Sequence, residues 1–252
     1  MLRENPGGLL PFHYVAAIVE LGHKYQIDHL CAEGLDRMKT CFCHRFSTMQ
    51  STAEFGSMTP HGGTTSELGL YSSTLQVRPS RDAIRAVNLV RLVGEDSMLP
   101  VAFYLCTLLP VATLLSGTAM GRGLRHTLSG PDLALCLEAR TRLAMRASQR
   151  VQSLWDPLCC SNKCFTANTC DAALWTHRRA QRQLDRAVQS IPSVFENLER
   201  RIRSAKADGL CEACIEAVLF RHVEEMRFIW KKLPEDLDLE IAGWDADNTA
   251  AP

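Results

Sequence analysis

The sequence has no excess of charge of either sign. Lys and Arg together number 28 and so do Asp and Glu, which makes the formal net charge at pH 7 zero. A chain with this balance has no overall field that draws it to nucleic acid or to an anionic membrane. Binding to either would have to come from a local patch.

Long uninterrupted apolar runs are also missing. No charged residue lies between Asp96 and Arg122, but Pro100 and Pro110 interrupt that stretch. A membrane-spanning helix needs about 20 predominantly apolar residues. We therefore predict a buried helix followed by a turn, and no association with a membrane.

The N-terminal residues lack the basic, apolar and small-residue order of a secretory signal peptide. The chain has 11 cysteines, and an odd number leaves at least one of them unpaired in any full disulfide scheme. Disulfides persist in oxidising compartments and are rare in the cytosol and nucleus. We expect reduced thiols and an intracellular protein, cytoplasmic or nuclear.

Signatures of common catalytic sites are absent from the sequence. It contains no nucleophile elbow, no Walker-type phosphate loop, no dinucleotide-binding glycine pattern and no HExxH pair. We therefore expect a protein that is not an enzyme, with no catalytic residues and no organic cofactor. Binding to other proteins is the function class that we favour, and a cysteine-dependent enzyme is one alternative.

What the sequence does contain is helical periodicity. Apolar residues recur at helical spacing over most of the chain, and no alternating strand run of useful length accompanies them. Ser129, Pro131 and Asp132 form a helix start, with a capping hydroxyl, a proline in the first turn and an acid near the positive end of the dipole. We predict an all-α helical bundle with a long flexible linker, in which Trp230 is buried.

The linker separates two helical parts. Residues 47–79 are rich in Ser, Thr, Gly, Met and Pro and show no period. Their length exceeds the roughly 12 to 15 residues usual for loops inside compact domains. The predicted organisation is helices over 1–46, the linker over 47–79, a helical domain over 80–240 and an acidic flexible tail over 241–252.

Three stretches carry a resemblance to a known family. Residues 12–42, with the step His23, Lys24 and Tyr25 between two helices, are similar to the closing helices of a BTB/POZ domain in proteins of mushroom-forming fungi. Residues 83–109, with a Met-Leu-Pro step, resemble the helical region that follows in those proteins. Residues 211–239 resemble their ending.

The resemblance covers roughly half of the chain and implies a module that binds protein partners. The strand-rich N-terminal half of a BTB domain has no counterpart here. We therefore expect the C-terminal part of such a protein, and the contact residues of that missing half have no equivalents in this sequence.

Cysteines are densest in two short segments of the C-terminal half. Zinc is held by four ligands in a tetrahedron, and pairs of thiolates close in sequence supply two each. We predict a structural zinc site built from Cys160, Cys164, Cys211 and Cys214, with Cys159 or Cys170 as substitutes. The other interpretations are reduced thiols that pack as small apolar groups, or a redox CxxC pair.

A basic segment offers a second function. Residues 177–206 carry eight Lys and Arg residues against three acids, namely Arg178, Arg179, Arg182, Arg186, Arg200, Arg201, Arg203 and Lys206 against Asp185, Glu196 and Glu199. Such charge is the first requirement for binding phosphates. Because no aromatic interleaving accompanies it, a solvated helix face is the favoured interpretation, and the alternative is a zinc-stabilised nucleic-acid-binding protein.

Overall fold

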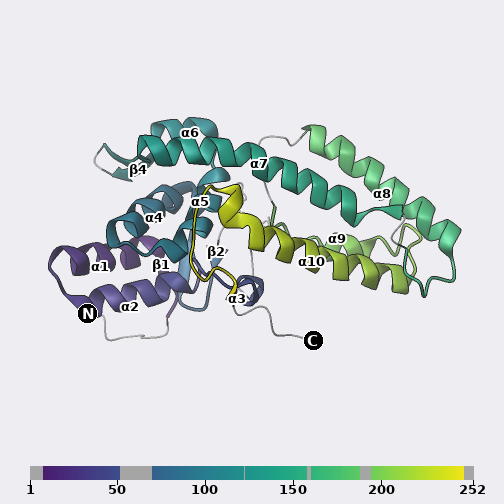
Figure 1. The fold of residues 1–252 in the computed structure, drawn as a ribbon, viewed down its shortest axis with the longest axis horizontal. Coiled ribbons are helices and arrows are strands. Elements are labelled where there is room, and N and C mark those ends of the chain that lie inside the picture. Colours follow the sequence, from purple (N-terminus) through teal and green to yellow (C-terminus); the bar gives the residue numbers. More distant parts are fainter. Residues whose placement is uncertain (1–7, 52–69, 122, 158–159, 188–193, 247–252) are drawn as a thin grey trace. The chain divides into compact units, whose positions relative to one another are not determined.

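The structure is a computed structural model that describes residues 8–51, 70–121, 123–157, 160–187 and 194–246. The chain divides into two compact units, and each is considered by itself (Figure 1). Unit 1 comprises Met1–Ala139 and Leu233–Pro252, and unit 2 comprises Arg140–Lys232. Within the described ranges, none of the helices combines the length and the apolar character needed to cross a bilayer.

Unit 1 is built mainly of helices, as predicted. They are α1 (Phe12–Lys24), α2 (Asp28–Lys39), α3 (Phe46–Ser51), α4 (Pro79–Val93), α5 (Leu99–Thr107), α6 (Val111–Ser116) and a short 3-10 helix at Asp96–Met98. Every residue of α5 is buried, as expected for a helix that is apolar on all sides. The part of the uncharged stretch that forms α5 is therefore buried, and Pro100 is tolerated because it lies in the first turn.

The prediction of an all-α fold is correct only at the coarse level, because unit 1 also holds small sheets. Strand β1 (Leu10–Pro11) pairs in parallel with β3 (Leu75–Val77), and β2 (Leu70–Tyr71) pairs antiparallel with β3. Strands β4 (Thr118–Gly121) and β5 (Leu124–His126) form an antiparallel pair. These strands have two to four residues each, which is too short for apolar alternation to stand out in the sequence.

The segments predicted as linker and tail contribute to unit 1 where they are described. Helix α3, β2 and β3 lie wholly or largely within 47–79, of which residues 52–69 are outside the described part. In the tail, Asp245 is buried. Its carboxylate accepts a hydrogen bond from the Phe46 backbone N–H at 3.1 Å, and its own N–H donates to the His44 carbonyl at 3.1 Å. Residues 247–252 of the predicted tail lie outside the described residues.

Unit 2 contains the second half of α7 (Gly130–Leu154), α8 (Ala167–Ala187), α9 (Glu199–Ser204) and most of α10 (Glu212–Asp236). Helix α7 begins where the sequence predicts, since the Asp132 backbone N–H donates to Ser129 Oγ at 3.2 Å. In Figure 1 the loop between α7 and α8 and the turn that precedes α10 lie at the same end of this unit. That end carries the cysteine-rich segments.

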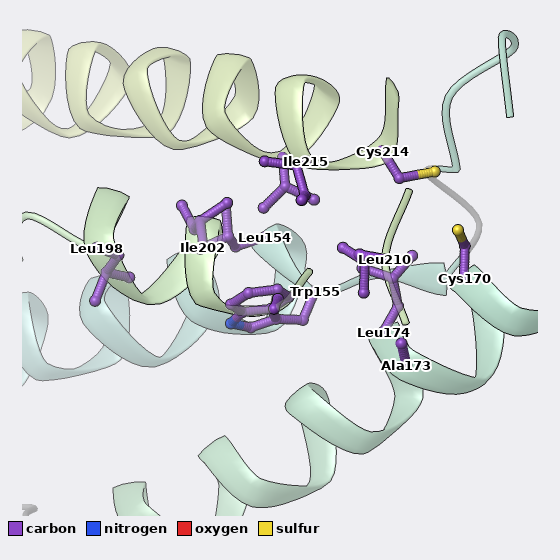
Figure 2. Close-up of a cluster of buried hydrophobic side chains, with 12 residues drawn as sticks. Leu154, Trp155, Cys170, Ala173, Leu174, Leu198, Ile202, Leu210, Cys214 and Ile215 are labelled. Carbon is purple, nitrogen blue, oxygen red and sulfur yellow. The ribbon is translucent and has the colours of Figure 1, made fainter. Parts of the chain in front are cut away.

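An apolar core joins the four helices of unit 2 (Figure 2). It consists of Leu154, Trp155, Cys170, Ala173, Leu174, Leu198, Ile202, Ala205, Leu210, Cys214, Ile215 and Val218. Trp230 is fully buried, as predicted, and its ring meets Phe195 edge-on at a centroid distance of 5.7 Å. Two of the core residues are cysteines, so the cysteine-rich segments belong to the packed interior of this unit.

A buried arginine fixes the chain that leads into α9. The guanidinium of Arg150, on α7, donates to the carbonyl oxygens of Val194 and Glu196 at 2.8 Å each. It also lies 2.8 Å from Nδ1 of His222 on α10, and both side chains are 2% exposed. Because a guanidinium only donates, Nδ1 is the acceptor. Burial, followed by the charge of Arg150, lowers the pKa of His222 to about 4.

Candidate metal centre

Four cysteines from two distant segments meet in unit 2. Cys164 lies in the loop after α7 and Cys170 lies in the first turn of α8, while Cys211 immediately precedes α10 and Cys214 lies in its first turn. Helix starts suit such groups, because the positive end of the helix dipole favours a thiolate. The chain therefore delivers two sulfurs from each segment to one point.

The four Sγ atoms all lie within 4.8 Å of one another. The sulfurs of Cys164 and Cys211 are 3.7 Å apart, and every one of the four is a free thiol. Cys170 and Cys214 are buried, whereas Cys164 and Cys211 are partly exposed. Figure 2 shows the sulfur atoms of Cys170 and Cys214 at one end of the apolar core, on the same side of it. These four residues could hold a metal ion.

Hydrogen bonds surround the sulfur of Cys170. It lies 3.3 Å from the donating backbone N–H of Cys211 and 3.4 Å from the Thr166 hydroxyl. Burial raises the pKa of the Cys170 thiol, but these hydrogen bonds and those from the thiols of Cys164 and Cys211 outweigh it and lower the pKa to about 7. A thiolate is therefore accessible near neutral pH, and the thiolate is the form that binds a metal.

The sulfur of Cys214 has a different environment. Burial raises the pKa of its thiol above the ordinary range, and a hydrogen bond from the backbone N–H of Ser161 acts in the opposite direction. A bound divalent cation would supply the charge that favours the thiolate here. With an ion bound, the N–H groups of Ser161 and Cys211 would serve as outer partners that orient two of the four sulfurs.

One separation within the group of four sulfurs fits the edge of a tetrahedral site. Metal–sulfur bonds of about 2.3 Å, the usual zinc–thiolate length, give tetrahedral edges of about 3.8 Å between sulfurs. The 3.7 Å separation of Cys164 and Cys211 matches such an edge. A disulfide would instead require about 2.05 Å.

Three of these four residues were predicted from the sequence as ligands. Cys164, Cys211 and Cys214 belong to the group, and its fourth member is Cys170, which the sequence offered only as a substitute. Cys160, the remaining predicted ligand, is partly buried and packs against the same core. Burial raises the pKa of its thiol. Cys159, the other substitute, lies outside the described residues.

Two features of the site could not be read from the sequence. The role of Thr166 depends on the turn that brings its hydroxyl back to Cys170, four residues further on. The preference for Cys170 over Cys160 depends on where α8 begins, at Ala167. A helix start just ahead of a cysteine was the available signal for this choice.

Comparison of the chain with protein-family models, with curated proteins and with solved structures found no match. The resemblance to the closing part of a BTB domain therefore stays a prediction.

Proposed function

We propose that this chain binds one zinc ion through Cys164, Cys170, Cys211 and Cys214, and that the ion stabilises unit 2 of a non-enzymatic module that binds other proteins. The observation that carries the proposal is the convergence of four free thiols within 4.8 Å. They come from segments about forty residues apart in sequence, so a bound ion would close a long loop. Such a link stabilises the fold when the ion is bound.

Zinc is the metal that this donor set favours. Four thiolates suit zinc or an iron–sulfur centre, and carboxylates or carbonyls would be needed for magnesium or calcium. One tetrahedron of sulfurs accommodates a single zinc ion. Two of the sulfurs also accept hydrogen bonds from backbone N–H groups, and such bonds to the ligands orient them in metal sites.

The complete set of protein ligands supports a structural role. Catalytic zinc sites keep one position for water or substrate, whereas structural sites are filled by four protein ligands. Four cysteines fill the tetrahedron, so an ion held here has no position left for a reacting molecule. This is the basis on which we propose a module that is not an enzyme.

Metal content of the purified, reduced protein tests the zinc proposal. We expect about one equivalent of zinc, and replacement by cobalt should give the absorption bands of tetrahedral thiolate coordination. Cys211→Ser should lose the ion, whereas the matched control Cys31→Ser, a partly exposed thiol of unit 1, should keep it. Protein that contains no zinc after refolding with excess zinc would exclude the proposal.

Exposed aromatic side chains support the binding of a protein partner. Phe165 is 99% exposed, Phe220 68% and Trp175 44%, all in unit 2. Aromatic residues are enriched where proteins meet their partners. Phe165 follows the ligand Cys164 directly, so zinc binding would also fix the loop that presents it.

Cross-linking of the zinc-loaded chain in a cell extract tests this second part. We expect a reproducible set of cross-linked proteins that is lost in Phe165→Ser, while Tyr25→Ser, an exposed aromatic of unit 1, retains it. Capture that is unchanged in Phe165→Ser would contradict a partner surface at this loop.

The alternative, a zinc-stabilised nucleic-acid-binding protein, has less support. Described basic side chains of the 177–206 segment face acids of the same unit: Arg203 lies 2.9 Å from Glu199, Lys206 lies 2.8 Å from Glu212 and Arg178 lies 3.6 Å from Asp156. The side chains of Arg182 and Arg186 lie outside the described part. Salt-dependent retention on nucleic acid would favour this alternative.

A further inference from the structure

Two of the four proposed ligands are more accessible than the other two. Cys164 and Cys211 are partly exposed, whereas Cys170 and Cys214 are buried. Phe165, the residue that follows Cys164, is 99% exposed, so this part of the loop lies at the surface of unit 2. A small polar oxidant therefore reaches the sulfurs of Cys164 and Cys211 more readily than the two buried sulfurs.

The two partly exposed ligands are also close neighbours. Their Sγ atoms lie 3.7 Å apart, although the residues are 47 positions apart in the sequence. A disulfide bond measures about 2.05 Å, so the two sulfurs need to approach each other by only about 1.7 Å. Cys164 lies in the loop between α7 and α8 and Cys211 directly precedes α10, so neither residue is held inside a helix. Accessible sulfurs with a second thiol beside them are typical of cysteines that are oxidised reversibly.

We propose that Cys164 and Cys211 make the zinc site an oxidation-sensitive switch, in which peroxide converts these two ligands into a disulfide and the ion is released. The inference rests on the proposed zinc function and names what regulates that site. After oxidation only Cys170 and Cys214 remain as ligands. Two thiolates do not fill the four positions of a structural zinc site, so the ion is lost.

The reaction takes two steps, with hydrogen peroxide as the only oxidant. Both sulfurs are thiolates when they bind zinc, and the thiolate is the nucleophilic form. One thiolate attacks an oxygen of the peroxide, the S–O bond forms, the O–O bond breaks, and the products are a sulfenic acid and hydroxide. The second thiolate attacks the sulfenic sulfur, the S–S bond forms, the S–O bond breaks, and a second hydroxide leaves. The two sulfurs together lose the two electrons that the peroxide gains.

The disulfide would join the same two segments that the ion joins. The loop after α7 and the residue before α10 stay linked, so the switch releases the ion without separating them. A thiol reductant and zinc would restore the site, because a disulfide, unlike a sulfinic acid, is reversed by thiol exchange.

Treatment of the zinc-loaded chain with increasing amounts of hydrogen peroxide tests the inference. Zinc release is followed with a chromophoric chelator, and the remaining thiols are alkylated before peptide mapping. We expect the disulfide between Cys164 and Cys211 to be the first to form and to increase in step with the released zinc. A different pair linked first, or zinc released without any disulfide, would overturn the inference.

A matched pair of variants adds a second measurement. Cys164→His keeps a group that can bind zinc but cannot form the disulfide, so it should release the ion about tenfold more slowly than the unchanged protein. Cys160→Ser removes a partly exposed thiol that packs against the same core and is not one of the four converging sulfurs. This control should release zinc at the unchanged rate. Equal rates in Cys164→His and the unchanged protein, or equal slowing in both variants, would count against the pair.

The possible failures are distinguishable. If the chain holds no zinc before peroxide is added, the proposed zinc function is overturned, and the inference with it. If zinc is present but the first disulfide lies elsewhere, the inference alone is overturned. Where Cys164→His does not retain zinc, Cys211→His takes its place, and the peptide map of the unchanged protein decides in either case.

Discussion

Cysteines behave differently in the two units. In unit 1, Cys41, Cys43, Cys106 and Cys136 are buried, and burial raises the pKa of Cys41 to about 11 and that of Cys43 to about 12. In unit 2, four sulfurs converge and hydrogen bonds lower the pKa of Cys170 to about 7. Hydrogen bonds also reach the sulfurs of Cys41 and Cys43, but burial outweighs them there. The same side chain is a small apolar group in one unit and a candidate ligand in the other, because the described sulfurs that converge lie in unit 2.

The two interiors also differ in the kind of charged side chain that they bury. Unit 1 contains the fully buried helix α5, whose nine residues include only two with side-chain hydroxyls. Unit 2 buries the charged Arg150 beside His222 in addition to its cysteines. The described buried charged side chains of unit 1 are instead acids, such as Asp82 and Asp245.

The largest expected effect is removal of the metal. A strong chelator, or Cys214→Ser, should destabilise unit 2 by about 4 kcal/mol where free zinc had been a thousandfold above the dissociation constant. Hydrogen exchange should show lost protection in α8 and the first turns of α10, and unchanged protection in α4 and α5. Equal losses of hydrogen-exchange protection in both units would contradict the difference drawn between them.

The second-largest destabilisation is expected from loss of the buried guanidinium of Arg150. Arg150→Met leaves the carbonyls of Val194 and Glu196 without their donor, which should lower the free energy of unfolding by about 3 kcal/mol. Arg146→Met, on the same helix and partly exposed over the ring of Phe228, should cost under about 1 kcal/mol. Denaturant titration of both variants gives the difference, and similar costs would contradict the role of Arg150.

Acid should weaken unit 2 through His222. Its pKa is about 4 in the folded chain against 6.5 for the ordinary side chain, so the unfolded chain binds the proton more readily between these values. The contribution of neutral His222 to the free energy of unfolding is fully present above pH 6.5. It falls as the pH drops towards 4, by about 3 kcal/mol in total. Denaturant midpoints across this range should fall less steeply in His222→Asn, which keeps an acceptor but does not titrate. Identical slopes would show that His222 does not carry the effect.

The smallest effect is expected for a cysteine of unit 1. Cys106 is fully buried next to Cys136, and burial, followed by that neighbour, raises the pKa of its thiol well above the ordinary value. Cys106→Ala should cost about 1 kcal/mol, the usual size for a modest core change, and should leave the zinc content unchanged. Reduced zinc content in this variant would mean that the two groups of cysteines are not separate.

Helices and strands differ in how far they could be predicted. The apolar period of α4 and the start of α7 at Ser129 are local features, and the structure has both. The pairing of Leu10 with Leu75 joins strands of two and three residues across 64 intervening positions. Such pairs leave no period in the sequence, because alternation needs at least four residues to be recognised.

The sequence by itself determined that the chain is mostly helical, that Trp230 is buried and that cysteines gather in two segments, because helical period and residue density are local properties. Only the tertiary structure decided which four sulfurs meet. Cys160 and Cys170 are both available in the sequence, but the first turn of α8 brings Cys170 to the N–H of Cys211, and Cys160 is not one of the four sulfurs that converge. Metal sites depend on distances of a few ångströms between segments far apart in the chain, and those distances follow from the packing of helices rather than from residue spacing.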